Sequence, residues 1–348
     1  MLDQLHPQAR AVVAALVTLP IVFASLGPAA GNVVLVPETQ DSYDTLLDAA
    51  TQIDGAAASS RLGAGIVTGD FSCDGVTDIA MASGGGVQVL HGPIESLPPA
   101  VDLAAPVDGF LIEDAYSSVV DAAGDVNGDG CDDLLVPFGA SDTYVVFGRA
   151  GSDPVRLSAL GAGGFRVVSS SFSSRSTDAE GIGDVNRDGL GDIVLSDANA
   201  DSAYVVFGQT GSSDVVLSTL GSRGYPIAVE GVESVSDAAD VNRDGLPDLL
   251  LGASRFDGRE GQDTGAVWVV FGKANTTPMD VTSLGAAGYR IEGGDETQYI
   301  GVEVVNAGDV NTDGVPDQLI GRISLSEGRG GVMVVFGKSS STKTVRLK

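Results

Sequence analysis

A nine-residue acidic pattern occurs five times in this chain and constrains the fold more than any other feature. It reads D-x-[NS]-x-D-G-x-x-D, at 70–78, 125–133, 184–192, 240–248 and 309–317. Each copy is followed by a short apolar run, and then by a second run that ends in glycine, as in YVVFG at 204–208. The copies start 55 to 69 residues apart. Repeats of about this length indicate a propeller or a solenoid.

The apolar runs have the composition of β-strands. They are rich in Val, Ile, Leu and Phe and are bounded by Gly, Asp, Asn and Ser. Between repeats lies a third element of the form V-x-L-x-x-L-G-x-x-G-[FY]-x-[IV], as at 155–167 and 215–227. Each repeat therefore supplies about four strands. We predict an all-β fold, a β-propeller of five four-stranded blades.

The two ends of the repeat region are complementary. Residues 45–56 resemble 282–294, and the C-terminus stops just before the same strand would occur. The strand that contains TQIDG is therefore expected to join the C-terminal blade and close the ring, which removes exposed sheet edges. The alternative is that the chain is part of a six- or seven-bladed ring.

The N-terminus has the pattern of an export segment. Residues 11–30 carry no charge and follow Arg10, and small residues near Ala29 and Ala30 suit a signal peptidase. We expect a signal peptide or N-terminal anchor at 1–30, a linker at 31–44 and the propeller at 45–348. The protein is expected to be secreted or held at the cell surface, with membrane contact only through an uncleaved N-terminal segment.

The charge excludes several classes of partner. The chain has 19 Lys and Arg against 47 Asp and Glu, a net charge of −28. Such a chain cannot neutralise a row of phosphates, so we expect no nucleic-acid binding, and adhesion to anionic lipid is disfavoured. With two His in the whole chain, histidine-based catalysis and zinc sites have few candidate residues.

Each acidic loop has the donor set of a calcium site. Side-chain oxygens stand at positions 1, 3, 5 and 9, a glycine at position 6 permits a sharp turn, and the carbonyl of position 7 can join them. Ca²⁺ accepts six to eight such oxygens, whereas Mg²⁺ demands a stricter octahedron. The predicted ligands, for up to five ions, are Asp70, Ser72, Asp74, Val76 and Asp78; Asp125, Asn127, Asp129, Cys131 and Asp133; Asp184, Asn186, Asp188, Leu190 and Asp192; Asp240, Asn242, Asp244, Leu246 and Asp248; Asp309, Asn311, Asp313, Val315 and Asp317.

The acidic loops also resemble two other kinds of turn. An EF-hand needs a bidentate Glu at position 12, but here position 12 lies inside a strand. Ordinary Asx-rich turns would explain one copy. Five copies in register favour a metal site, because fifteen Asp at positions 1, 5 and 9 would repel one another without cations.

The combination of VVFG with D-x-N-x-D-G-x-x-D resembles the FG-GAP repeats of the integrin alpha-chain N-terminal β-propeller and its bacterial relatives. The resemblance covers roughly residues 45–348. It implies that cations brace the loops between the first and second strands of each blade, on one face. It also implies that loops on the opposite face bind ligands. Integrin propellers have seven blades, whereas five repeats are counted here, and His91 replaces the FG phenylalanine of the first repeat.

Other residues were assigned individually. Cys73 and Cys131 lie in the first two loops, and both a disulfide and two free small residues remain open. We expect His91 to have a packing or turn role. An inter-blade core is expected to include Phe147, Phe207, Phe271, Phe336 and Trp268. The polar insertion at 254–266, with Arg255 and Arg259, is either a binding loop or a solvated connector.

These features together predict a calcium-binding extracellular interaction or adhesion module. Its ligand would be an unidentified protein or glycan, bound on the face opposite the calcium loops. No catalytic residue is predicted, because nearly every regularly placed Asp is already assigned to a cation. An exported hydrolase that uses a propeller cleft and a purely structural surface component are the alternatives.

Overall fold

The computed structural model describes residues 21–23, 32–37, 51–56, 61–115, 119–138, 142–169, 178–294, 298–324, 329–338 and 344–347. The predicted cleavage site near Ala29 and Ala30 lies outside these residues, as does most of the predicted linker. Within the described ranges, no helix combines the length and the apolar character that a membrane crossing requires.

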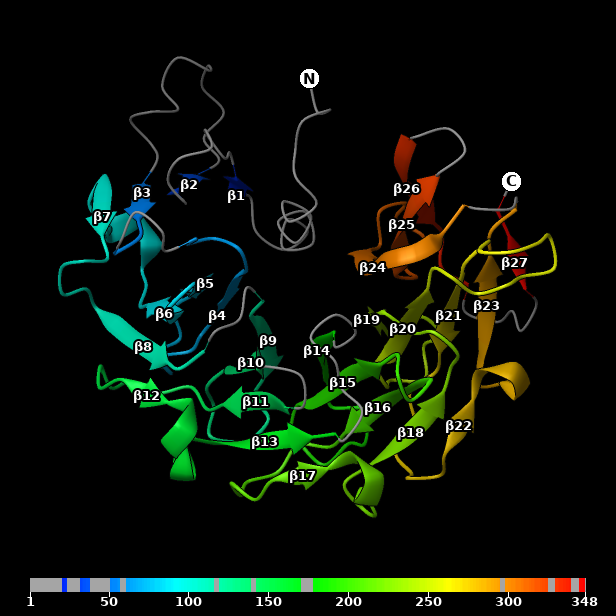
Figure 1. Cartoon of the computed structure of the whole chain (residues 1–348), viewed down its shortest axis with the longest axis horizontal. Helices are drawn as coiled ribbons and strands as arrows, with labels where there is room; N and C mark the ends of the chain where they lie inside the picture. Colours follow the sequence, from blue (N-terminus) through cyan, green and yellow to red (C-terminus); the bar gives the residue numbers. More distant parts are fainter. Residues whose placement is uncertain are drawn as a thin grey trace. The chain divides into compact units, whose positions relative to one another are not determined.

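The chain divides into two compact units. Unit 1 comprises residues 1–122, 130–138 and 144–165, and unit 2 comprises 123–129, 139–143 and 166–348. Figure 1 shows the strands of both units in sequence colours.

Unit 2 contains the sheets of the third, fourth and fifth repeats. Their strands, in sheet order, are β14 (Ala179–Gly183), β15 (Asp192–Asp197), β16 (Ser202–Val206), β18 (Gly224–Ala228) and β22 (Met279–Asp280); β19 (Ser234–Ala239), β20 (Asp248–Ala253), β21 (Ala266–Val270), β23 (Gly288–Glu292) and β27 (Val345–Arg346); β24 (Ile300–Gly308), β25 (Asp317–Ser324) and β26 (Arg329–Val335). All residues of β20 and β21 are buried, which explains why these segments read as continuous apolar runs rather than alternating ones.

Unit 1 contains the sheet of the first repeat and an N-terminal sheet. Their strands, in sheet order, are β12 (Val155–Arg156), β8 (Gly109–Glu113), β6 (Gly86–Leu90), β5 (Asp78–Ser83) and β4 (Ile66–Gly69); β1 (Ile21–Phe23), β2 (Asn32–Pro37), β3 (Thr51–Asp54) and β7 (Ala100–Asp102). The sheet of the second repeat has residues in both units, in the order β17 (Val215–Val216), β13 (Gly164–Val168), β11 (Asp142–Val146), β10 (Asp133–Phe138) and β9 (Asp121–Gly124). Short 3₁₀ turns stand at η4 (Ile94–Ser96), η5 (Leu157–Ala159), η6 (Gly161–Gly163), η7 (Leu217–Thr219) and η8 (Val281–Ser283).

The prediction of an all-β fold built from blades of four antiparallel strands is confirmed for the complete repeats. In the third repeat β14, β15, β16 and β18 pair in chain order, all antiparallel. The structure adds a fifth strand that the sequence analysis did not foresee. The V-x-L part of the element between repeats forms a two-residue strand that pairs in parallel with the outer strand of the preceding repeat, as β22 does with β18 and β27 with β23. Successive repeats therefore interlock.

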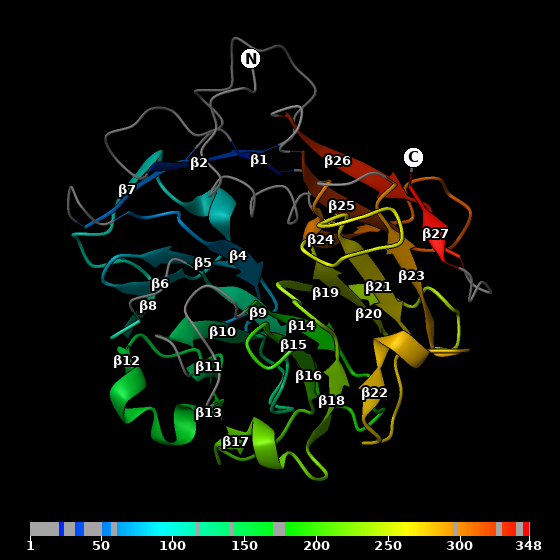
Figure 2. The ribbon, with the colours of Figure 1, turned by 45° about the vertical axis from the view of Figure 1, so that its right-hand side comes forward.

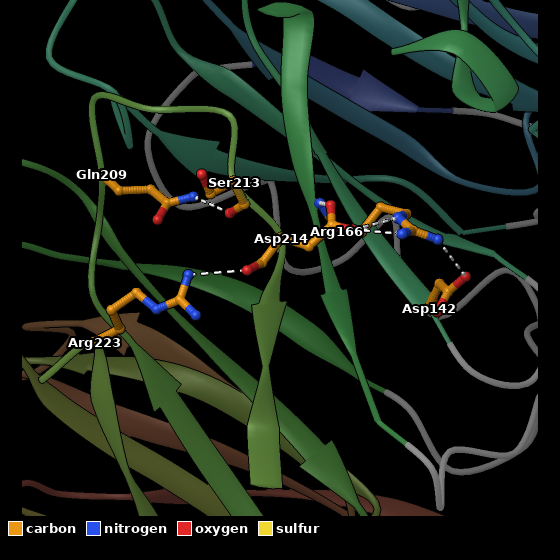
Figure 3. Close-up of polar contacts among 6 residues, drawn as sticks. All are labelled: Asp142, Arg166, Gln209, Ser213, Asp214 and Arg223. Atoms are coloured by element: carbon orange, nitrogen blue, oxygen red, sulfur yellow. Dashed lines mark hydrogen bonds and ion pairs between the residues drawn. The ribbon is translucent and has the colours of Figure 1, made fainter. Parts of the chain in front are cut away.

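Polar side chains hold one of these interlocking strands in place. Asp214, just before β17, accepts a hydrogen bond from Nε of Arg166 on β13 at 3.0 Å, and its carbonyl accepts one from Nη1 of Arg223 at 2.9 Å (Figure 3). Gln209 donates to the carbonyl of Ser213 at 2.7 Å, and Arg166 also faces Asp142. The Arg166 guanidinium holds the pKa of Asp214 below its usual value. We interpret this cluster as a structural brace.

The structure does not show the ring closure that was predicted for the TQIDG strand. This strand, β3, pairs antiparallel with β2 and parallel with β7. Both of its hydrogen-bonding edges are therefore occupied within the N-terminal sheet. Among the described residues, the sheet of the fifth repeat has three strands, β24, β25 and β26.

The fifth repeat also corrects one core assignment. Phe336 is 55% exposed, beside exposed Val332 and Val334 of β26. In the preceding repeats an outer strand of the G-[FY]-x-[IV] type pairs with the equivalent strand and covers it. The described residues of the fifth repeat include no such strand, so its FG phenylalanine has no aromatic partner there.

The core of unit 2 lies between neighbouring sheets. The first strands β14, β19 and β24 lie side by side, and the other strands of each sheet follow outward from them (Figure 2). Trp268 on β21 and Tyr225 on β18 belong to one buried cluster that joins the third and fourth sheets. Hydrogen bonds link the first strands, because the Val304 amide donates to the Ser234 hydroxyl at 3.1 Å and the Val235 amide donates to Asp178 at 2.9 Å.

Candidate cation site

Each acidic loop connects the first strand of its sheet to the second. In unit 2 the loop 184–192 follows β14, the loop 240–248 follows β19 and the loop 309–317 follows β24. These are called loops 3, 4 and 5 here, and the copies at 70–78 and 125–133 are loops 1 and 2. In a blade of antiparallel strands, the connection between the first two strands always lies at the same end of the sheet. The acidic loops therefore hold the same side-chain oxygens at equivalent positions in each repeat.

The aspartate at position 1 organises the turn. In loop 3, Oδ1 of Asp184 accepts the amide hydrogen of Asp188 at 3.0 Å and Oδ2 accepts that of Gly189 at 2.9 Å. The corresponding distances are 3.0 and 2.8 Å in loop 4, and 3.0 and 2.7 Å in loop 5. A short polar side chain that accepts from amides further along the chain is the usual device of an Asx turn.

Positions 3 and 5 bring further oxygens to the same turn. Asn242 Oδ1 accepts the amide hydrogen of Asp244 at 2.8 Å, while its Nδ2 donates to Oδ2 of Asp244 at 2.9 Å. Oδ1 of Asp244 accepts the amide hydrogen of Leu246 at 2.9 Å. Equivalent bonds within 0.1 Å of these distances occur in loops 3 and 5. Side-chain oxygens from positions 1, 3 and 5 therefore converge on one turn.

The aspartate at position 9 is buried and serves the backbone. Asp248 has no exposed surface, and its Oδ2 accepts the amide hydrogens of Val241 at 2.9 Å and Asn242 at 3.2 Å. Its Oδ1 accepts that of Gly272, the glycine of the VVFG strand, at 2.9 Å. Because each carboxylate oxygen has two lone pairs, both pairs of Oδ2 are used and one pair of Oδ1 is left for a cation. The sequence predicts a ligand at this position but does not indicate its structural role.

Burial disfavours the charged form of the aspartate at position 9. Burial raises the pKa of Asp192 to about 7, the amides of Gly208 and Val185 oppose the shift, and the carboxylates of Asp188 and Asp184 add to it. Burial likewise raises the pKa of Asp248 to about 7. The charged form of a carboxylate becomes favourable again when a positive charge lies beside it.

The VVFG glycine is required by close approach to the loop. A Cβ atom built on Gly272 would lie 2.1 Å from the carbonyl oxygen of Pro247, which is position 8 of loop 4. The other repeats show the same contact. The pairs are Gly92 with Thr77, Gly148 with Asp132, Gly208 with Gly191 and Gly337 with Pro316, at 2.0 to 2.5 Å. The two sequence signatures of the repeat, VVFG and the acidic loop, are therefore parts of one structural unit.

Loops 1 and 2 show the same elements with one covalent addition. In loop 1, Oδ1 of Asp70 accepts from the amide of Asp74 at 3.0 Å. In the part of loop 2 that belongs to unit 2, the Asp129 amide donates to Asp125 at 3.0 Å. Within unit 1, Cys73 and Cys131 form a disulfide with their Cα atoms 4.5 Å apart.

The donor set fits a hard divalent cation. The part of the chain that the structure describes holds no group of three or more His, Cys, Asp and Glu side chains that could form a metal site by themselves. In the acidic loops, position 3 is Asn or Ser, and the carboxylate at position 9 accepts backbone amides, as Asp248 does. The remaining donors are carboxylate, amide and carbonyl oxygens, which suit Ca²⁺ better than a soft metal.

The aromatic positions form edge-to-face pairs. The FG aromatic of a repeat packs against the aromatic of its G-[FY]-x-[IV] strand with ring centroids 6.0 to 6.3 Å apart. The pairs are Phe147 with Phe165, Phe207 with Tyr225, Phe271 with Tyr289 and, in the first repeat, His91 with Phe110. Trp268 is 1% exposed, as expected of a core residue. His91 occupies the aromatic position of its repeat and packs as its counterparts do.

The insertion at 254–266 forms an anchored loop between β20 and β21. Phe256 packs edge-to-face on Trp268 at 5.2 Å, and the hydroxyl of Tyr299 donates to Asp263 at 3.0 Å. Arg255 and Arg259 are exposed. Loop 4 leads into β20 and the insertion leads out of it, so the two loops lie at opposite ends of this strand. The strand has six residues and is about 20 Å long.

The repeats share three features. Their strands pair in chain order, an acidic loop follows each first strand, and a glycine of the third strand lies against that loop. These features define an all-β repeat protein. Residues 234–270, which run from β19 through loop 4 to β21, match the family described as FG-GAP repeat. The resemblance to FG-GAP and integrin alpha sequences is thereby confirmed.

Curated relatives agree with this family match. The chain is 29% identical to human integrin alpha-6 over 127 residues, which is 35% of this chain and 9% of the relative. It is 34% identical to integrin alpha-3 of Cricetulus griseus over 101 residues, which is 29% of this chain and 9% of the relative. The matches thus span about a tenth of the relatives' length. Among solved structures, BBS1N in complex with ARL6DN is similar over 92% of this chain and 75% of that chain, with 9% identity and a TM-score of 0.46.

Proposed function

We propose that this chain is a calcium-binding extracellular interaction module of adhesion type. The observation that carries the proposal is the agreement among loops 3, 4 and 5. In each, the same oxygens at positions 1, 3 and 5 are held by the same bonds, with distances that differ by 0.2 Å at most. Donors so placed suit one hard cation per loop, with the position 7 carbonyl and Asp at position 9 completing the set.

The proposed mechanism is preorganisation. Cations in the loops offset the repulsion among their aspartates and fix the end of each sheet at which the loops lie. A rigid scaffold loses less conformational entropy when loops at the other end bind a partner. The anchored insertion at 254–266, with Arg255 and Arg259 exposed, is the proposed contact surface for a polar protein or glycan ligand.

The experiment is a binding screen of the calcium-loaded chain against extracellular proteins and glycans, repeated in chelator. We expect a partner whose binding falls at least tenfold in chelator and in the variant Arg255→Ala/Arg259→Ala. The matched control is Arg156→Ala, which removes an exposed arginine of another repeat and should bind as the parent does. A partner that binds equally well in calcium, in chelator and to the double variant would overturn the proposal.

A further inference from the structure

In three of the five acidic loops, the side chain at position 4 reaches the next loop along the chain. Position 4 has left-handed backbone in the loops of unit 2, with φ of 62° at Arg187, 63° at Arg243 and 60° at Thr312. Arg187 of loop 3 donates from Nη2 to the carbonyl of Asp244 in loop 4 at 2.7 Å. Arg243 of loop 4 donates from Nη2 to the carbonyl of Asp313 in loop 5 at 2.9 Å. One contact therefore recurs between consecutive loops.

The carbonyls that these arginines hold are next to a proposed cation ligand. Asp244 and Asp313 are position 5 of their loops, and Arg243 also donates from Nε to the carbonyl of Gly314, position 6, at 3.2 Å. The next carbonyl, that of Val315, is the proposed ligand at position 7. An arginine fork on positions 5 and 6 thus fixes the peptide units that present this ligand and leaves the ligand itself free.

A second link of the same kind occurs in unit 1, with different chemistry. Cys73 is position 4 of loop 1, and its disulfide partner Cys131 is position 7 of loop 2. Position 4 is thus joined to the turn of the following loop by a covalent bond in one pair of loops and by arginine in two. In loop 2 position 4 is Gly128, which has no side chain to make such a link.

We propose that Arg187 and Arg243 are positioning residues that couple the three cation loops of unit 2, so that a cation in one loop raises the affinity of the next. The inference rests on the proposed cation binding and specifies how the sites are regulated. A cation held by positions 3 and 5 fixes position 4 between them, and with it the arginine. The next loop then loses less conformational entropy when its own cation binds.

The charge of the arginine acts in the opposite direction. A guanidinium beside loop 5 repels an incoming cation there, which would weaken binding. Arg187 and Arg243 are both exposed, so solvent and salt screen this repulsion. Arg243→Lys removes the hydrogen-bond geometry of the guanidinium but keeps its positive charge. Arg243→Ala removes both the hydrogen bonds and the charge. The two variants therefore separate positioning from repulsion.

The test is a CaCl₂ titration of the full chain, followed through the backbone amide signals of Gly245 in loop 4 and Gly314 in loop 5. In Arg243→Ala and in Arg243→Lys, we expect the midpoint of the Gly314 transition to move to about three- to tenfold higher calcium, the effect of one hydrogen bond of ordinary strength. Arg223→Ala is the matched control, because it also removes an arginine-to-carbonyl bond but touches no acidic loop. The Gly314 midpoint should not change in the control.

Coupling also has to be reciprocal. Blocking loop 5 with Asp313→Asn should raise the Gly245 midpoint in the parent chain. The same substitution should leave that midpoint unchanged in the Arg243→Ala background. A purely structural role of Arg243 would lower the melting temperature in chelator but would not produce this dependence on the state of loop 5.

The outcomes are distinct. If neither amide of the parent chain responds to CaCl₂, the proposed cation binding fails. If both respond but the Arg243 variants leave the midpoints unchanged, or Arg243→Ala tightens loop 5, cation binding stands and the coupling is overturned.

Discussion

The aspartate at position 9 has two roles at the scale of a single residue. Asp248 is proposed to bind a cation, and its carboxylate also accepts three backbone amides inside the protein. The exposed Asp244 contributes to the proposed cation site but has a smaller part in the backbone of the loop. The two positions thus allow binding and folding to be tested separately.

Asp248→Ala should destabilise the metal-free protein by roughly 2–4 kcal/mol, because several buried amides lose their acceptor. Asp244→Ala, its control, should cost about 1 kcal/mol or less in chelator, yet remove calcium binding at loop 4 as fully as Asp248→Ala does. Urea unfolding in chelator measures the first effect and calcium titration the second. Equal destabilisation by the two variants in chelator would show that the backbone role is misassigned.

Asp178 gives the molecule a pH dependence that is independent of the cation loops. It accepts the amide hydrogens of Val235 and Ala179, and burial raises its pKa from 3.8 to about 6. The folded state therefore holds a proton more tightly than the unfolded state between these values. Its contribution to stability decreases as the pH rises from about 4 to 6 and is constant above that range.

Asp178→Asn should abolish this contribution. We expect the difference in unfolding free energy between variant and parent, measured in chelator, to change in favour of the variant between pH 4 and 6 and then to level off. A difference that stays constant from pH 4 to 7 would contradict the raised pKa.

The VVFG strand and the acidic loop behave as one element, because the strand's glycine lies against the loop. Gly272→Ala would place a methyl group 2.1 Å from the Pro247 carbonyl oxygen. We predict a loss of about 2–4 kcal/mol, since backbone has to move and the bond to Asp248 is disturbed. Gly211→Ala is the control, with nothing within 4 Å of its added Cβ, and should change stability by about 0.5 kcal/mol or less. Chemical denaturation of both variants measures these changes. Similar losses of unfolding free energy in the two variants would refute the contact.

The elements that sequence predicted are those with a strong local signal. The four strands of a repeat could be predicted from apolar runs and turn residues, because these features depend on residues close together in the sequence. The two-residue strands β12, β22 and β27 are too short to show a periodicity, and their partners belong to the preceding repeat. The pairing of β3 with β2 and β7 likewise depends on which strands lie beside it in the tertiary structure, and residue patterns do not reveal this.

The candidate site was predictable to a similar degree. Ligand types and spacing in the loops follow from one repeated motif. The bond from Gly272 to Asp248 joins residues 24 apart, and the reach of Arg243 to Asp313 joins residues 70 apart. Such contacts depend on how sheets stack, so no pattern within a single loop indicates them.

At the scale of the whole molecule, the acidic loops connect composition to function. The net charge of −28 would work against a compact chain, and much of the acidity recurs at fixed points in the five repeats. Arginines and a disulfide connect consecutive loops. We propose that cations neutralise the acidic loops and that the braced blades bind a partner at their other end.

Counting the calcium ions bound to the purified chain by equilibrium dialysis, at about 10 mM free calcium, tests this account most directly. Sites of the extracellular kind have dissociation constants of about 10⁻⁴ to 10⁻³ M, so this concentration fills them. The account predicts close to five ions per chain, decreasing by one when a single loop is disabled by Asp188→Asn. Fewer than one ion per chain, with all five loops intact, would contradict it.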